Sequence, residues 1–226
     1  MEANPLDVIM EGPRWVVINK PAGIATEKHF NYDTIEARAQ VQWKRPKSTK
    51  EPFVGIVHRL DRPVSGALLL ARNKSTLRLL NTTFAEKKVS KTYWALTDNP
   101  LPNEVGKLKH YLARNHSGRR AIASTRPVPG AKESLLAYRL LRKQSGRYLY
   151  EVKPITGRFH QIRVQLATAG APICGDAVYG SQSILQPHCI GLHAYELRFP
   201  SPEGDQVAVV APPPQWFNDG AVIFTP

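Results

Sequence analysis

The sequence predicts an α+β fold with a mixed, largely antiparallel central β-sheet flanked by helices and loops. Short apolar stretches of strand length recur along the chain, and fewer segments show apolar residues at helical spacing. Because helices and strands do not alternate strictly, a doubly wound parallel sheet is disfavoured. The 226 residues contain no internal repeat and no long linker, so we expect one domain over residues 1–226, with its core at about 14–200 and a Pro-rich tail at about 200–226.

The first half of the chain is expected to place two helices among its strands. Residues 14–18 are typical of a strand, which the Pro and Gly of residues 19–23 would end. The next expected elements are a helix at 33–43, a polar loop at 45–52, a strand ending near Ala71, and a helix from Ser75 to about Lys88. Ser75 is a favourable N-cap for this helix, whose apolar face would carry Leu77, Leu80 and Phe84.

The second half is richer in expected strands. Its elements are a strand at 90–97, short strands and turns over 100–134, strands at 135–142 and 148–155, a helix at 158–169, and a last strand at 189–199. On the helix, Phe159, Ile162 and Leu166 fall on one stripe, which Arg163 borders. Because burial of a lone cation is costly, Arg163 either pairs with a carboxylate such as Asp61 or extends to water.

The charge of the chain indicates a polyanionic partner. Lysine and arginine number 31 against 18 aspartates and glutamates, which gives a net charge of +13 and a pI of about 9.9. The basic residues are spread through the chain, which favours a folded basic surface over a charged tail. Since each phosphate that Lys or Arg neutralises releases counterions, nucleic acid is the leading partner class, and an acidic membrane surface is the second.

Several classes of protein are disfavoured. No apolar run approaches the ~18 residues of a membrane span, and the acidic, Pro-containing N-terminus resembles no signal or transit peptide. Cys174 and Cys189 are too few for a disulfide framework or a four-ligand zinc site, so we expect a cytoplasmic protein. His58 and His160 lack a second ligand at metal-binding spacing and favour local structural roles, and no dinucleotide fingerprint occurs. We therefore expect neither a metal nor a cofactor.

One short segment combines charge, turn residues and a following strand. Residues 58–66 read His-Arg-Leu-Asp-Arg-Pro-Val-Ser-Gly and lead into an apolar run. A carboxylate on a turn that directly precedes a buried strand lies where a rigid sheet can hold a reactive group. The alternative is that Asp61 pairs with Arg59 or Arg62 at the surface, as most such neighbours do. The local pattern leaves both possibilities open.

This segment resembles the active-site signature of the RluA-type pseudouridine synthases. Other segments resemble motifs of the same family in the same order: Asn-Lys-Pro-Ala-Gly at 19–23, Lys-Thr-Tyr-Trp-Ala at 91–95, Gly-Arg-Phe-His-Gln-Ile-Arg at 157–163, and the turn Gly-Asp-Ala-Val-Tyr-Gly at 175–180. The match covers about residues 14–200. Val64 and Gln165 depart from it, since the family commonly has Thr and His there. The RNA-binding S4 domain of many relatives is expected to be absent.

The resemblance implies a pseudouridine synthase-like fold and the isomerisation of uridine in RNA. The N1–C1′ bond would break, the uracil would turn, and a C5–C1′ bond would form. Asp61 would be the nucleophile, attacking either the ribose or the base. Tyr93 would stack on the uracil and take part in proton transfers, and Arg163 would pair with Asp61. Further expected substrate-binding residues are Arg59, which would enter the RNA stack as the uridine leaves, His58, Arg62, Arg158, Gln161 and Ile162.

The expected partner is a structured ribosomal or transfer RNA. No membrane or obligate protein partner is expected, and we expect a monomer. A non-catalytic RNA-binding module on the same fold is the alternative, because it needs only the basic surface. A glycosidase with an aspartate nucleophile agrees less well, since no second carboxylate lies in a matching motif.

Overall fold

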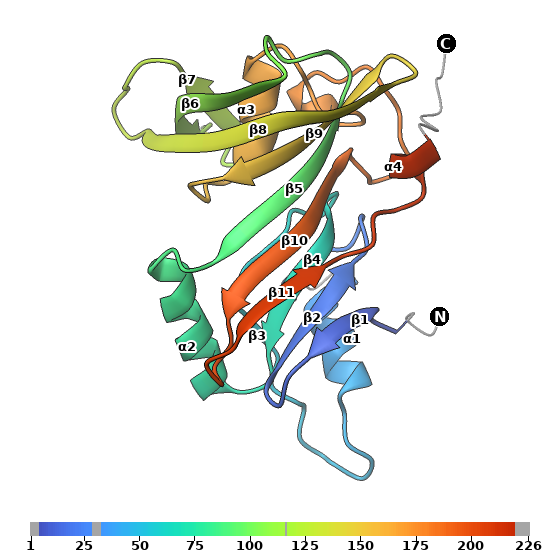
Figure 1. Cartoon of the computed structure of the whole chain (residues 1–226). Coiled ribbons are helices and arrows are strands. Elements are labelled where there is room, and N and C mark those ends of the chain that lie inside the picture. Colours follow the sequence, from blue (N-terminus) through green and yellow to red (C-terminus); the bar gives the residue numbers. More distant parts are fainter. Residues whose placement is uncertain (1–4, 29–32, 116, 220–226) are drawn as a thin grey trace. The chain divides into compact units, whose positions relative to one another are not determined.

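A computed structural model describes residues 5–28, 33–115 and 117–219 (Figure 1). It divides into two compact units, one formed by residues 1–91 and 194–213, the other by residues 92–193 and 214–226. Both consist of antiparallel strand pairs with helices on the sheet, which confirms the predicted α+β class. The expectation that the chain acts as one domain stays a prediction. Each unit is described in turn.

The first unit is built on strand β4. Its elements are β1 (Val8–Glu11), β2 (Trp15–Lys20), α1 (Ile35–Gln42), β3 (Gly55–Ile56), β4 (Ser65–Ala71), α2 (Lys74–Ala85), most of β10 (Leu192–Pro200), and β11 (Gln206–Val210). The strand order is β1-β2-β4-β10, with β3 also paired to β4 and β11 to β10. The pairs β1–β2, β2–β4, β3–β4 and β10–β11 are antiparallel. Every residue of β4 is buried, as expected of a strand covered on both faces.

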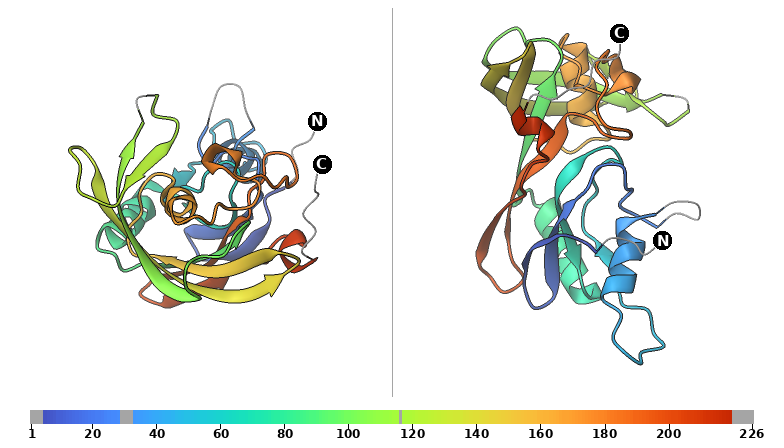
Figure 2. Two further views of the ribbon diagram at one scale, coloured as in Figure 1. Left: turned by 90° about the horizontal axis from the view of Figure 1, so that it is seen from above. Right: turned by 90° about the vertical axis from the view of Figure 1, so that its right-hand side faces the viewer.

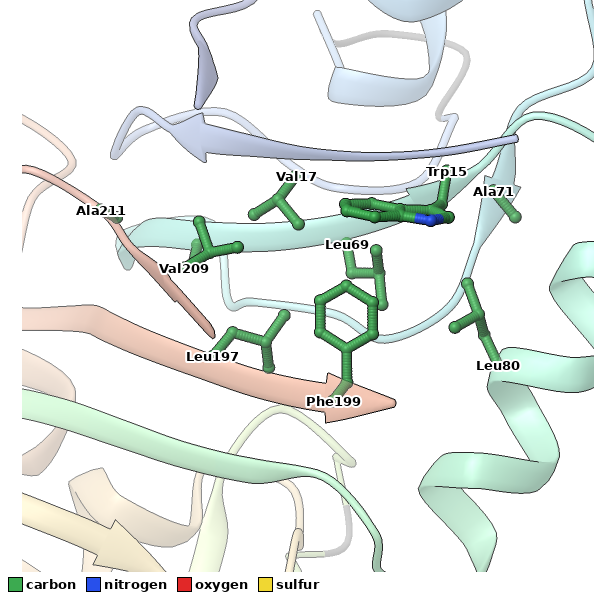
Figure 3. Close-up of a cluster of buried hydrophobic side chains, with 10 residues drawn as sticks. Trp15, Val17, Leu69, Ala71, Leu80, Leu197, Phe199, Val209 and Ala211 are labelled. Atoms are coloured by element: carbon green, nitrogen blue, oxygen red, sulfur yellow. The ribbon is translucent and has the colours of Figure 1, made fainter. Parts of the chain in front are cut away.

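The core of this unit joins residues that are far apart in the sequence (Figure 3). The rings of Trp15 and Phe199 meet edge to face with centroids 5.2 Å apart, next to Leu69 of β4. Leu80 of α2 is buried in the same cluster, and Leu77 and Phe84 pack against it, as their helical spacing predicted. This apolar cluster packs against β4 and holds the strand in place.

Three expectations for this unit need correction. The N-cap of α2 is Asn73, whose Oδ1 accepts from the backbone N–H of Thr76 at 2.8 Å, while Ser75 donates its hydroxyl to the same Oδ1 at 2.8 Å. The helix ends at Ala85, before the expected Lys88. The C-terminal segment is more than a Pro-rich tail, because β11 pairs with β10 through the turn at 201–205.

The second unit contains a curved antiparallel sheet and one central helix. Its elements are most of β5 (Ser90–Thr97), β6 (Val105–Arg114), β7 (Ala121–Ser124), β8 (Lys132–Gln144), β9 (Arg147–Pro154), α3 (Gln161–Thr168), the 3₁₀ turn η1 (Ala177–Tyr179), and α4 (Trp216–Asp219). The strand order is β5-β9-β8-β6-β7, and all these pairs are antiparallel. Helix α3 packs against β6 and β7, on the concave side of the sheet (Figure 2).

The start of α3 differs from the expectation. The helix begins at Gln161 because His160 has a left-handed backbone with φ of 52°, so Arg158 and Phe159 belong to the preceding turn. Gln161 to Leu166 are all buried, which means that α3 is covered around its circumference and has no single apolar stripe. The region 100–134 also contains longer strands than expected, because its polar residues alternate along the exposed face of β6.

The end of the described chain is held by Phe217. Its ring is 1% exposed in a cluster with Leu96, Leu149, Cys174 and Leu185, and its carbonyl accepts from the Arg142 guanidinium at 2.6 Å. Phe217 therefore anchors the C-terminal segment to the second unit. Within the described residues, the helices are too short and too polar to cross a membrane.

Candidate active site

Asp61 lies on a tight turn of the first unit that feeds directly into β4. The carbonyl of Asp61 accepts from the N–H of Val64 at 3.0 Å, which closes the turn, and β4 starts at Ser65. The Asp61 side chain is half-buried. The prediction that Asp61 is a reactive carboxylate requires a backbone that holds it in place, and this hydrogen-bonded turn provides that backbone.

A buried lysine supports the turn from below. Lys20 is 0% exposed, and its Nζ donates to the carbonyls of Pro21 at 2.8 Å, Arg62 at 3.3 Å and Val64 at 2.8 Å. These carbonyls satisfy a cation that would otherwise be costly to bury. Gly23 also donates its N–H to the carbonyl of Arg62 at 2.8 Å. Residues 20–23 thus hold the backbone of residues 62–64 in place.

Residues 19–23 were expected to form a turn and to match a family motif, but the support that Lys20 gives to residues 62–64 was not predicted. A signal was present, because Lys20 is the last residue of β2, whose residues 15–18 are apolar, and a lysine at the end of a buried strand needs acceptors. The sequence does not indicate two of the three acceptor carbonyls, those of Arg62 and Val64, because these residues lie more than 40 positions away from Lys20.

His58 ties the same segment to the middle of β4. Its Nε2 accepts from the N–H of Leu69 at 3.1 Å, and its ring stacks on Phe84 with centroids 5.1 Å apart. Burial, with a smaller effect from the nearby charge of Lys91, lowers the pKa of His58 to about 3. A neutral imidazole is needed here, because Nε2 must keep its lone pair to accept. This agrees with the structural role expected for His58, and its contact with substrate stays a prediction.

The two arginines beside Asp61 have partners in the neighbouring loop. Arg59 is exposed, and its Nη1 lies 2.9 Å from the carboxylate of Glu27. Arg62 donates its Nε–H to the carbonyl of Gly23 at 2.8 Å. An exposed pair such as Arg59–Glu27 contributes little to stability, so Arg59 can leave Glu27 at small cost.

The second unit carries Tyr93 and the residues of the 157–163 motif. Tyr93 is half-buried on β5, in register with Val152 of β9. Arg158 is exposed and Ile162 is buried. The amide of Gln161 is buried and accepts from Thr156 and from the N–H of Arg158, at 2.8 and 3.0 Å, and donates to the carbonyl of Leu135 at 3.1 Å. Gln161 therefore shapes the turn that precedes α3, and its substrate contact stays a prediction.

Arg163 is held by a bidentate ion pair within its own unit. Its Nε and Nη2 lie 2.7 and 2.9 Å from the two carboxylate oxygens of Asp176, and both side chains are almost fully buried. The Arg163 side chain is therefore buried at the helix rather than extended to water. The expected pairing of Arg163 with Asp61 joins residues of different units and stays a prediction.

Two rings complete the surroundings of Arg163. Its Nη1 is 2.9 Å from Nε2 of His160, whose Nδ1 is 2.9 Å from the hydroxyl of Tyr179. Because a guanidinium only donates, Nε2 must accept, so the His160 proton lies on Nδ1 and points to Tyr179. The Tyr179 hydroxyl also accepts from the N–H of Ala121 at 2.8 Å, and burial raises the pKa of Tyr179.

The sequence placed Asp176 and Tyr179 in a turn that resembles a family motif, without predicting their contacts with Arg163 and His160. A buried arginine bordering a helix, followed by an aspartate in a glycine-flanked turn, is the signal that could have singled out Asp176. Gln165 is also fully buried, and its Nε2 contacts the carbonyls of Leu108 and Ser134 at 3.0 and 3.2 Å. In the part of the chain that the structure describes, no group of three His, Cys, Asp or Glu residues is arranged to hold a metal ion.

Comparison with known proteins identifies the class. The sequence pattern of the family described as RNA pseudouridylate synthase matches residues 14–168, which is more than half of the chain. An uncharacterized RNA pseudouridine synthase of Zymomonas mobilis is 35% identical over 214 residues, covering 90% of this chain and 92% of the relative. Ribosomal large subunit pseudouridine synthase D of Borreliella burgdorferi is 33% identical over 199 residues, and the match covers 85% of this chain and 60% of that protein.

The fold is shared with solved structures as well. Human RNA pseudouridylate synthase domain containing 1 has a TM-score of 0.78 and 26% identity, with 98% of this chain and 91% of that chain covered. The chain therefore belongs to the RNA pseudouridylate synthase family, whose members are isomerases. The resemblance read from the motifs is confirmed.

Proposed function

We propose that this protein is an RNA pseudouridine synthase that isomerises a specific uridine of ribosomal or transfer RNA. The observation that carries the proposal is Asp61, in the family's signature segment, on a turn that Lys20 supports from a second family motif. The name of the Borreliella relative refers to the large ribosomal subunit, which favours ribosomal RNA as the first substrate to test.

In the proposed reaction, the carboxylate of Asp61 is the nucleophile. It attacks the ribose or the base, the N1–C1′ bond breaks, and the uracil turns so that C5 bonds to C1′. The proton lost from C5 is matched by one gained at N1, so the reaction is redox-neutral. Tyr93 would stack on the uracil and handle these protons, and Arg163 would keep Asp61 ionised. Covalent catalysis by a carboxylate at a glycosidic carbon is established chemistry.

The uridine must leave the RNA stack before Asp61 can reach it, which costs a few kcal/mol. Arg59 is proposed to fill the vacated space, and its exposure and weak pairing with Glu27 leave it able to move. His58, Arg62, Arg158, Gln161 and Ile162 are proposed to line the site. Neither cofactor nor protein partner is required, and we expect a cytoplasmic monomer with both cysteines as free thiols.

The test compares two single-aspartate variants. Asp61→Ala should abolish pseudouridine formation in protein-free ribosomal RNA and in unmodified transfer RNA while RNA binding is retained. Asp7→Ala, which alters an exposed aspartate of the same unit, should keep wild-type activity. Mapping pseudouridine in total RNA of cells with and without the gene identifies the position. Product formation at the wild-type rate by Asp61→Ala would exclude Asp61 as the nucleophile.

The basic surface alone would also suit a non-catalytic RNA-binding module. That alternative predicts RNA affinity without any position whose pseudouridine depends on the gene. Loss of a mapped pseudouridine in the deletion strain, restored by wild type and not by Asp61→Ala, decides against it.

A further inference from the structure

Two exposed arginines of the second unit are held on aromatic rings next to α3. The Arg114 guanidinium lies over the ring of Phe159, 4.3 Å from its centroid, and Phe159 in turn stacks on His160 with centroids 3.8 Å apart. The guanidinium of Arg120 lies over the ring of Tyr179 at 5.6 Å. Attraction between a cation and a ring face is worth about 0.5–1 kcal/mol at exposed sites, enough to bias a long side chain toward one position.

The rings themselves are fixed by the network around Arg163. Tyr179 is buried, and its hydroxyl accepts from the N–H of Ala121 and contacts His160. Arg114 of β6 is paired with Ala121 of β7. Arg120 directly precedes Ala121, whose N–H donates to the Tyr179 hydroxyl. The two arginines therefore share one end of the β6–β7 hairpin, beside α3.

Neither guanidinium is paired with a carboxylate in the part of the chain that the structure describes. Among the described residues, no aspartate or glutamate lies within ion-pair distance of Arg114 or Arg120, whereas Arg139 pairs with Glu151 in the same unit. The acidic groups of this region are already engaged, since Glu133 bonds Lys109 at 2.8 Å and Asp176 is paired with Arg163. Two positioned, uncompensated cations are thus left exposed on one face.

A ring under a guanidinium covers its flat face and leaves the in-plane N–H groups for a ligand. Phosphate oxygens suit these donors, because guanidinium binds phosphate in its plane. Holding the side chain in advance also lowers the entropy lost on binding. No carboxylate of the described residues has to be displaced.

We propose that Arg114 and Arg120, which lie over the rings of Phe159 and Tyr179, form a surface that binds backbone phosphates of the substrate RNA. This inference rests on the proposed function for the identity of the polyanion. It assigns a role to Phe159, the third residue of the 157–163 motif, as the platform for Arg114. Phe159 also stacks on His160, which contacts Arg163, so the platform for Arg114 belongs to the same side-chain network of the second unit as Arg163.

The experiment measures the affinity for a labelled single-stranded RNA of mixed sequence as a function of salt. Each lost phosphate contact should lower the magnitude of the log–log slope by about 0.7, so the ratio of wild-type to variant affinity should rise about fivefold for each tenfold decrease in salt. Arg114→Ala and Arg120→Ala should each show this change. Phe159→Leu, which keeps the charge and removes the ring, should reproduce much of the loss seen with Arg114→Ala.

Arg119→Ala is the matched control. Arg119 is exposed in the same turn and carries the same charge, but no ring or carboxylate among the described residues holds it. Its slope should change less than half as much. An Arg119→Ala slope change equal to those of the other two would overturn the proposal, because it would reduce the effect to net charge. So would wild-type affinity of Phe159→Leu.

Two more outcomes distinguish this proposal from the enzymatic proposal and from membrane binding. If the mapped RNA shows no pseudouridine but the slopes change as expected, the enzymatic proposal fails and the phosphate surface stands. If the arginine variants lose affinity for anionic phosphatidylglycerol vesicles and keep it for RNA, the surface binds membranes and the proposal is wrong. Circular dichroism of each variant checks that the fold is retained.

Discussion

Arg163 and Asp176 form a two-point ion pair in which the side chains are 6% and 1% exposed, with N–O distances of 2.7 and 2.9 Å. The pair joins α3 to the turn at 175–180, and His160 accepts from the remaining terminal nitrogen of Arg163. Asp176 therefore fixes the orientation of a guanidinium that the proposed mechanism uses. This relationship leads to a prediction about stability and one about catalysis.

Replacing Asp176 by Ala should lower the free energy of unfolding by about 3–5 kcal/mol, because it leaves an uncompensated buried cation. Urea unfolding at pH 7 measures this change. Asp176→Asn keeps the size and part of the hydrogen bonding of Asp176, so it should be more stable than Asp176→Ala. It should lower kcat with little change in KM, because the guanidinium of Arg163 stays at the same position but loses its fixed orientation. A kcat equal to that of wild type in a folded Asp176→Asn protein would contradict the positioning role.

The pair between Arg198 and Glu196 provides the control. Arg198 is 59% exposed, and its Nη2 lies 2.6 Å from the Glu196 carboxylate. Solvent screens such a pair, so Glu196→Ala should cost no more than about 1 kcal/mol. Similar losses in the free energy of unfolding for Asp176→Ala and Glu196→Ala would mean that burial does not govern how much the Arg163–Asp176 pair stabilises the fold.

The sequence predicted the elements whose patterns are local. The spacing of Leu77, Leu80 and Phe84 marked the face of α2, and the apolar run ending at Ala71 marked β4. It misassigned the N-cap to Ser75, because Asn73 and Ser75 are both favourable caps and only the fold decides between them. The start of α3 was missed because His160 adopts a left-handed backbone, which a propensity argument disfavours.

The candidate site was predictable where a motif carries it and not where contacts join distant segments. Asp61 and Arg163 were singled out by their patterns. Lys20 was not, because its acceptors Arg62 and Val64 follow it by more than 40 residues. Asp176 pairs with an arginine 13 residues earlier, and nothing in the local pattern of the turn states which face of α3 it meets.

Lys20 should be essential for the shape of the Asp61 turn. Lys20→Met retains the buried aliphatic chain but removes a donor from the carbonyls of Pro21, Arg62 and Val64. The Arg62 carbonyl keeps the N–H of Gly23, whereas each buried carbonyl left unsatisfied costs about 1–3 kcal/mol. We expect a lower urea midpoint and reduced kcat. Lys44→Met, at an exposed lysine of the same unit, should change neither. Wild-type kcat in Lys20→Met would show that the turn keeps its geometry without this support.

The depressed pKa of His58, about 3, predicts acid sensitivity above the range where carboxylates titrate. The unfolded chain binds a proton at His58 near its ordinary pKa of 6.5 and the folded chain does not, so the stabilisation is fully present above pH 6.5 and declines as the pH falls toward 3. The expected slope is up to about 1.4 kcal/mol per pH unit. His110, whose pKa burial also lowers, contributes in the same direction.

Comparing wild type with His58→Gln isolates the His58 contribution, because His110 and the carboxylates are common to both. Urea unfolding at pH 7 and pH 5 should show a smaller loss of stability in His58→Gln than in wild type. Equal losses in the two proteins would mean that His58 is protonated in the folded state at pH 5.

Gly66, the last residue of the Asp61 segment, should tolerate no side chain. Its φ is 115°, and a Cβ added to it would lie 2.3 Å from the carbonyl oxygen and 2.6 Å from the nitrogen of Ala194, a backbone contact that cannot be relieved by rotating a side chain. Gly66→Ala must therefore shift β4 or β10, and we expect a protein that is insoluble or unfolded at room temperature. Gly204→Ala tests the contribution of backbone strain alone, since φ there is 100° and nothing lies within 4 Å of the added Cβ. It should fold and lose only about 1–2 kcal/mol. If the two variants lost the same stability in urea unfolding, the close approach of β4 to Ala194 would not be what requires glycine at position 66.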